Sequence, residues 1–147
     1  MIKEFEFYHG AAITRLIHSQ KPISIRVFPN HGNASYVVND SVGLYLKYSS
    51  NRLSPWAFSF QQTHQVEIDE LKKNFPNVIV GLICHEDGIV GLSYDELKTI
   101  LDHNHENVEW ISASRKPRGQ YSIKGKDGNL LYKISEGEYL KKVLEIS

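Results

Sequence analysis

The apolar residues in the first half of the chain recur with two different periods. Within 8-YHGAAITRLIHSQ-20 they return at helical spacing, which predicts an amphipathic helix that closes at Lys21-Pro22. Segments in which apolar and polar side chains alternate have the period of a half-buried strand, and they predict strands at 23–28, 35–39, 43–49 and 56–60. The turn residues Asp40-Ser41 predict a hairpin between the second and third of these strands.

The second half adds a buried strand and several shorter elements. The pattern predicts a helix over 61–74, ended by Pro76, and the run 78-VIVGLIC-84 is typical of a central strand covered on both faces. Ser93 and Glu96 form a capping box, which predicts a helix over about 94–102. Further strands are predicted at 89–92, 108–114, 120–125 and 129–134, and a short helix at about 137–145.

Runs of strands between helices favour an α+β fold over strictly alternating α/β. We therefore predict a single globular domain over 1–147, with a mixed central sheet flanked by helices. A β-hairpin, turning at 126-KDG-128, and a short helix are expected near the C-terminus. The chain has 147 residues, enough to bury a sizeable core without disulfides.

Amino-acid composition limits the possible classes of protein less than the pattern of apolar and polar positions does. Lysine and arginine together number 17, as do aspartate and glutamate, so the formal net charge is zero. Overall charge therefore gives no steering towards nucleic acid or membrane. The one cysteine, Cys84, lies in the apolar run 78–84 and is interpreted as a small buried hydrophobe. No window approaches the roughly 18 apolar residues of a membrane span, and we expect a cytoplasmic protein.

The strand at 43–49 carries the first candidate chemistry. Lys47 shares one face of this strand with Tyr45, and Asp40 lies in the turn that precedes it. A carboxylate that binds Mg²⁺ beside a lysine that stabilises developing phosphate charge is the arrangement of metal-dependent nucleases. Helix, three-stranded meander, helix and apolar strand also follow one another in the order found in such enzymes. On these features, residues 8–84 resemble the core of the restriction-endonuclease-like, or PD-(D/E)xK, superfamily.

The resemblance implies Asp40 as a metal ligand, Lys47 as a catalytic cation and Mg²⁺ as the cofactor. The family pattern places an acid two residues before the lysine, where this chain has Tyr45. A migrated acid is then expected from Glu67 on the following helix, or from Glu4 or Glu6 near the first. The alternative interpretation of Lys47 is a solvated or ion-paired strand lysine.

Other polar residues are candidates for holding phosphates. Arg52 lies in a turn next to the aromatic strand, and the loop after residue 114 contains three cations, Arg115, Lys116 and Arg118. His64 falls in the first turn of the helix at 61–74, where it could act as a general base or phosphate ligand, or else cap the helix or decorate the surface. Trp56 could stack on a base, although Trp56, Phe58 and Phe60 also read as a core stripe.

Two functions follow from these observations. The first is a nucleic-acid-acting protein with a nuclease-like core, either a Mg²⁺-dependent phosphodiesterase or a relative that has lost catalysis. The second is a non-enzymatic binding or regulatory module that meets a protein or nucleotide through its aromatic and basic loops. His103 and His105 have metal-ligand spacing but lie in the loop 102-DHNHEN-107, which favours a solvated loop.

Overall fold

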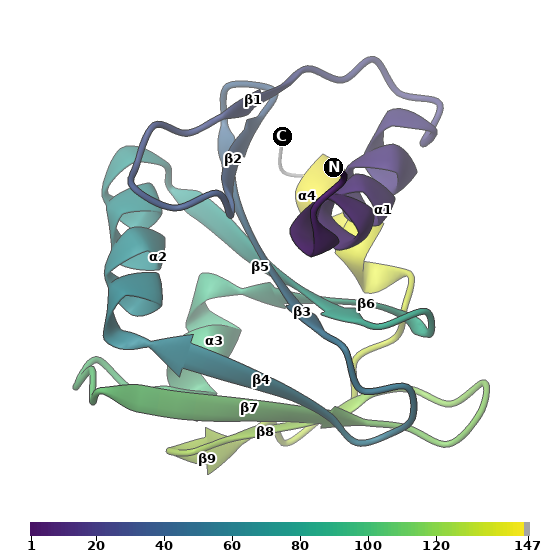
Figure 1. Ribbon diagram of the computed structural model, residues 1–147, viewed down its shortest axis with the longest axis vertical. Helices are drawn as coiled ribbons and strands as arrows, with labels where there is room; N and C mark the ends of the chain where they lie inside the picture. Colours follow the sequence, from purple (N-terminus) through teal and green to yellow (C-terminus); the bar gives the residue numbers. More distant parts are fainter. Residues whose placement is uncertain (146–147) are drawn as a thin grey trace.

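The computed structural model describes residues 1–145, which form an α+β domain with two sheets (Figure 1). The helices are α1 (Glu4–Ile17), α2 (Gln62–Asn74), α3 (Tyr94–Ile100) and α4 (Glu138–Glu145). The first sheet has the order β1-β2-β3-β5-β6, with bounds β1 (Ile25–Val27), β2 (Ser35–Val38), β3 (Val42–Ser49), β5 (Asn77–Cys84) and β6 (Gly88–Ser93). The second has the order β4-β7-β8-β9, with bounds β4 (Trp56–Gln61), β7 (Val108–Ser114), β8 (Ser122–Gly125) and β9 (Gly128–Asn129).

The first sheet is mixed because β3 and β5 run parallel. Their register extends from Val42 opposite Asn77 to Ser49 opposite Cys84, while the other neighbours are antiparallel. The connection from β3 to β5 passes through β4 and α2. The prediction of a central strand covered on both faces is confirmed: Val80 and Leu82 of β5 pack into one core cluster, and Ile79 and Ile83 into another.

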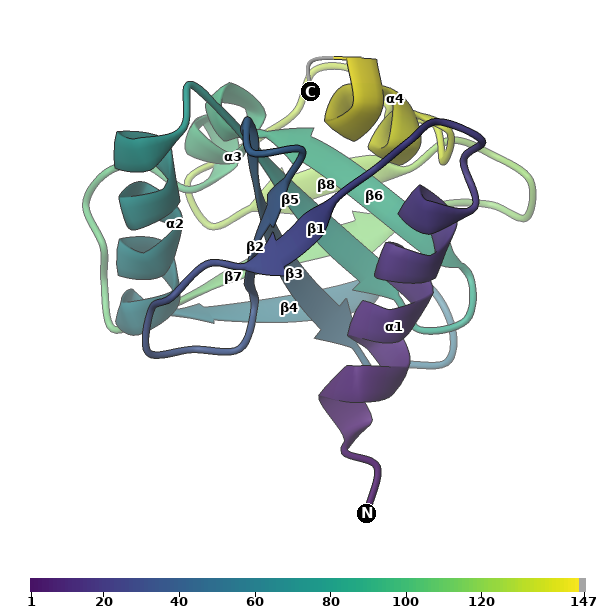
Figure 2. The ribbon, with the colours of Figure 1, turned by 90° about the horizontal axis from the view of Figure 1, so that it is seen from above.

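Helices cover one face of the first sheet, and the second sheet and two more helices cover the other. In Figures 1 and 2, α1 and α4 lie together on one side of β3, β5 and β6. The Tyr139 hydroxyl of α4 donates to the carbonyl of Ala12 in α1 at 3.0 Å, and both residues are buried. On the opposite side, α2, α3 and the second sheet enclose the larger core cluster.

The prediction of one central sheet was incomplete, because the strands form two sheets. The strand predicted at 56–60 is correct, and its stripe of Trp56, Phe58 and Phe60 is buried. It pairs with β7, however, and not with β3. Local alternation fixes which face of a strand is buried, but it carries no information on the partner.

Smaller predictions were confirmed or corrected. The capping box begins α3 as expected: the Ser93 amide donates to Glu96 Oε1 at 2.9 Å, and the Glu96 amide donates to Ser93 Oγ at 3.1 Å. The strand predicted at 129–134 shrinks to Gly128–Asn129 in β9, followed by a bridge from Ile134 to Tyr121. Within residues 1–145, no helix is long and apolar enough to cross a membrane.

Candidate functional site

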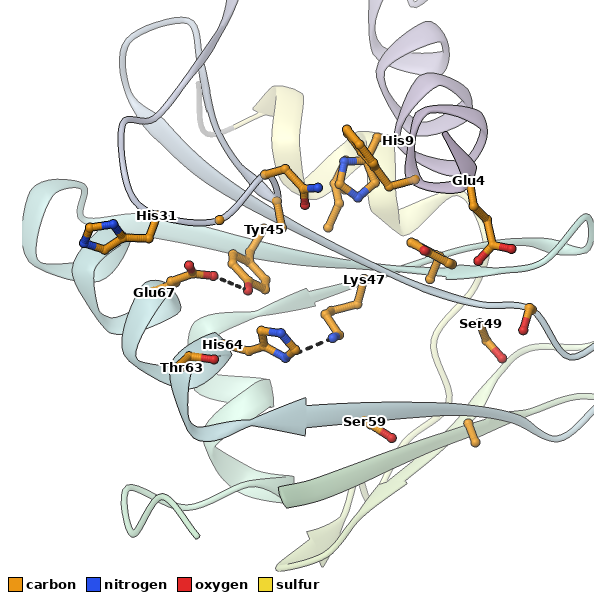
Figure 3. Close-up of a pocket in the computed structure, with 18 of the residues that line it drawn as sticks. Glu4, His9, His31, Tyr45, Lys47, Ser49, Ser59, Thr63, His64 and Glu67 are labelled. Carbon is orange, nitrogen blue, oxygen red and sulfur yellow. Dashed lines mark hydrogen bonds between the residues drawn. The ribbon is translucent and has the colours of Figure 1, made fainter. Parts of the chain in front are cut away.

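A polar cavity of about 850 Å³ opens beside β3, between the two sheets (Figure 3). Its walls come from the N-terminal part of α1, the loop before β2, strands β3 and β4, and the start of α2. The polar lining residues labelled in Figure 3 are Glu4, His9, His31, Tyr45, Lys47, Ser49, Ser59, Thr63, His64 and Glu67. Five segments, from residue 4 to residue 67, therefore supply one site.

Lys47 projects from β3 into this cavity and is half-buried. Its ammonium nitrogen lies 3.1 Å from His64 Nδ1 and 5.2 Å from the centre of the Phe60 ring. Within residues 1–145 it forms no ion pair with a carboxylate. Burial lowers the pKa of Lys47 to about 8, and the charge of Glu67 offsets part of this shift. The cavity thus contains a cation whose charge is only partly compensated.

His64 is positioned by the start of α2. It is the third residue of the helix, and its Nδ1 accepts a hydrogen bond from the Gln61 amide at 3.1 Å, in the manner of a capping group. Because that amide can only donate, Nδ1 is an acceptor, and the Lys47 ammonium donates to the same atom. Burial and the nearby Lys47 charge lower the pKa of His64. The ring is therefore neutral at pH 7, with its proton on Nε2.

Tyr45 and Glu67 form a second pair in the same cavity. The Tyr45 hydroxyl donates to Glu67 Oε1 at 2.7 Å, and burial together with this bond raises the pKa of Tyr45. Glu67 lies close to the loop before β2, where a Cβ at Gly32 would be 2.6 Å from Glu67 Oε2. The absence of a side chain at Gly32 lets the loop approach this carboxylate.

The structure brings together Lys47, His64 and Glu67 of the predicted catalytic set, but not Asp40. Asp40 is exposed in the β2–β3 turn, where its Oδ1 accepts from Arg26 at 3.2 Å, and it is absent from the cavity lining. The turn precedes the start of β3 at Val42, and five steps of about 3.3 Å each lead along the strand from Val42 to Lys47. The spacing in sequence is short, but the extended strand carries the two groups apart.

The predicted phosphate-binding cations divide into two kinds. Arg115 is held by Asp87 Oδ2 at 2.7 Å and Glu136 Oε2 at 3.5 Å, and its guanidinium lies 4.3 Å from the centre of the Tyr121 ring. Arg115 links the β5–β6 turn to the segment before α4, and its positive charge is compensated by these two carboxylates. The other three cations, Arg52, Lys116 and Arg118, are exposed in the two loops that follow β3 and β7.

Those two loops meet near the cavity. The Arg115 amide donates to Ser54 Oγ at 3.3 Å, which ties the loop after β7 to the loop after β3. Asn51 of the latter loop lines the cavity, so Arg52 is one residue from its wall.

Sequence reasoning overlooked two histidines of the cavity, His9 and His31. His9 is buried, its Nδ1 lies 2.8 Å from the Tyr36 hydroxyl, and burial lowers its pKa to about 4. His9 has the helical spacing from Ala12 and Leu16 that places it on the inward face of α1. This spacing could have identified His9 as buried from the sequence. No comparable pattern marks His31, which lies in an irregular loop.

Two other predicted features lie away from this cavity. Trp56 is only 3% exposed, so it belongs to the core and cannot stack on a ligand. His105 Nε2 lies 3.3 Å from Asp69 Oδ2, and within residues 1–145 no metal-ligand cluster includes His103 or His105. The three-ligand cluster found in that part of the chain comprises Asp102, Glu109 and Asp127, outside the cavity lining.

Comparisons with family models, with curated proteins and with solved structures found no match to the chain. The geometry of this cavity is therefore the basis for assigning a function to the chain.

Proposed function

We propose that the protein binds nucleic acid through a nuclease-like core, and that the cavity around Lys47 holds a phosphate group. The observation that carries the proposal is the half-buried ammonium of Lys47, which forms no ion pair with a carboxylate within residues 1–145. An incompletely compensated charge in a partly desolvated cavity is stabilised by an anionic ligand, because the interaction is screened less than at the surface.

The neighbours of Lys47 suit a phosphate. Hydroxyl groups of Ser49, Ser59 and Thr63 line the same cavity and can donate to phosphate oxygens. A cavity of about 850 Å³ lies within the size range of small-ligand sites, so it can admit one nucleotide unit but not the width of a duplex.

The order of elements supports the nuclease-like part of the proposal. A helix, an antiparallel meander and a crossover containing a helix lead to β5, which runs parallel to β3. This is the order expected from the resemblance over residues 8–84, with Lys47 on the third strand of the meander. Glu67, bonded to Tyr45, is then the acid that has moved to the following helix.

The donor set around Lys47 does not fit a Mg²⁺ centre. Mg²⁺ prefers several oxygen ligands in octahedral geometry. Glu67 already accepts from Tyr45, Asp40 is outside the lining, and no cluster of three metal-ligating groups occurs in this cavity among residues 1–145. We therefore derive no hydrolytic step and favour the relative that has lost catalysis over the phosphodiesterase.

The test is binding of a fluorescently labelled oligonucleotide measured by anisotropy. Lys47→Gln should lower the affinity at least tenfold, since a hydrogen bond to a charged group contributes about 1.5–3 kcal/mol. Lys73→Gln is the matched control, because it removes the same charge from an exposed position on α2 outside the cavity lining. Equal affinity of both variants would overturn the assignment of Lys47.

Two conditions sharpen this test. Affinity should fall with rising salt, because phosphate contacts displace counterions, and it should fall above pH 8 as Lys47 loses its proton. Incubation with Mg²⁺ or Mn²⁺ should leave the oligonucleotide intact. If the wild type cleaves the oligonucleotide and Lys47→Gln does not, the protein is a phosphodiesterase and the interpretation of lost catalysis is wrong.

A further inference from the structure

One face of the second sheet is open to solvent. Burial alternates along β4, β7 and β8, so that every second side chain points away from the core. We call these residues the outer face: Ala57, Ser59, Val108, Trp110, Ser112, Ser114, Ser122 and Lys124. None of them is a carboxylate, and most are small or carry a hydroxyl group.

The outer face continues directly from the wall of the Lys47 cavity. Ala57 and Ser59 line the cavity, and on the next strand Ser59 lies opposite Trp110 and Ala57 opposite Ser112. Directly opposed residues of an antiparallel pair share a face, with Cβ atoms about 5 Å apart. Trp110 is therefore the next side chain beyond the cavity wall.

The far end of the outer face leads to a second hollow. Ser112 lies opposite Lys124, and Ser114 opposite Ser122. A hollow of about 390 Å³ is lined by Ser114, Ser122 and Lys124 together with Tyr132 and Lys133. Cavity, outer face and hollow thus form one continuous surface with cations at both ends.

Trp110 is the prominent apolar group in the middle of this surface. Its side chain is 43% exposed, and Ser59 and Ser112 beside it are too short to cover an indole. The outer face itself contains no carboxylate, whereas Glu4 and Glu67 line the cavity at one end of the surface. An exposed indole on such a face, between cations, has the two properties of single-strand binding surfaces. These are an aromatic platform for bases and positive charge for the backbone.

We propose that the protein binds a single strand of nucleic acid that passes from the Lys47 cavity across the outer face, with one base stacked on Trp110. This inference rests on the proposed function and adds the class of ligand. A duplex is disfavoured because its bases are stacked on one another and cannot lie flat on an indole. Lys124 and Lys133 would contact the phosphates that follow the stacked base.

The experiment uses the full chain and a short oligothymidylate. The chain has two tryptophans, and Trp56 is buried, so quenching of the exposed indole reports on stacking at Trp110. Binding should quench the fluorescence of the wild type but not that of Trp110→Phe. Trp110→Ala should weaken binding at least about fivefold, and Trp110→Phe, which keeps an aromatic ring, should weaken it less. Val27→Ala is the control, since it trims an exposed apolar residue on β1, outside the outer face and the cavity lining.

The outcomes separate the two proposals. Loss of affinity in Lys47→Gln with wild-type affinity in Trp110→Ala would overturn the path across the outer face and leave the phosphate site standing. Unchanged affinity in Lys47→Gln would count against the phosphate site itself. A blunt duplex that binds as tightly as the single strand would also overturn the inference, because its bases cannot reach Trp110.

Discussion

Replacing Lys47 by methionine should make the protein more stable at neutral pH while removing its phosphate site. Burial holds the pKa of Lys47 at about 8 instead of 10.5, and each pKa unit corresponds to about 1.4 kcal/mol. The charged lysine therefore lowers the free energy of unfolding at pH 7 by about 3 kcal/mol. Methionine keeps the length of the side chain but loses the contact with the Phe60 ring, worth about 1 kcal/mol. It also loses the hydrogen bond to His64 Nδ1, worth about 1 kcal/mol. The net gain is about 1 kcal/mol.

The sign of the pH dependence provides the sharper test. Between pH 8 and 10.5 the unfolded chain binds more protons at Lys47 than the folded chain, so the contribution of Lys47 to stability rises through this window. The gain from Lys47→Met should disappear by pH 9.5, where the variant should be less stable than the wild type by about 0.5 kcal/mol. Urea unfolding of both proteins at pH 7 and 9.5 measures this change, and titrating groups distant from Lys47 cancel in the difference between the two proteins. A variant less stable than the wild type at pH 7 would refute the reasoning.

Three further predictions concern the cavity and the core. Glu67→Gln should raise oligonucleotide affinity about fivefold, because it removes a negative charge near Lys47 and still offers an oxygen to Tyr45. Cys84 should react with a thiol reagent only when the protein unfolds, since it is buried and burial raises its pKa. Gly91→Ala should lower the free energy of unfolding by about 1–3 kcal/mol, because the new Cβ would lie 2.7 Å from a backbone atom of α4.

Each of these has a contrary result. A fall in affinity for Glu67→Gln would show that the carboxylate contributes to binding. Modification of Cys84 at a rate independent of denaturant would contradict its burial. Gly137→Ala is the control for Gly91→Ala, because no atom lies within 4 Å of the new Cβ at that position. Equal stabilities of the two variants would show that close packing at Gly91 does not limit stability.

The elements that sequence predicted well are those fixed by local patterns. The apolar run in β5 and the capping box at Ser93 depend on neighbouring residues, and both lie where they were expected. The stripe containing Phe58 was also assigned to the core correctly. Such features depend on side-chain period and helix-end hydrogen bonds, which a single sequence displays directly.

The candidate site depended on contacts that no local pattern encodes. Lys47, His64 and Glu67 were each named, but their meeting in one cavity results from the crossover between β3 and β5. Asp40 was grouped with them on spacing alone, and the extended strand separates it from Lys47. Trp110 was overlooked because its exposure follows from the pairing of β7 within a sheet that the sequence did not reveal.

Successive segments of the chain contribute strands to the first sheet, the second, the first again and the second again. This order has a consequence for folding. A fragment of residues 1–93 has every strand of the first sheet, but it also carries β4 without β7 and so leaves the backbone hydrogen-bonding groups on that edge of β4 unpaired. A fragment of residues 56–147 has every strand of the second sheet and carries β5 without β3. Neither sheet can be excised as an independent unit, and we expect one cooperative unfolding transition detected equally by all probes. A ligand seated between the sheets would then protect the slowest-exchanging amides of both at once.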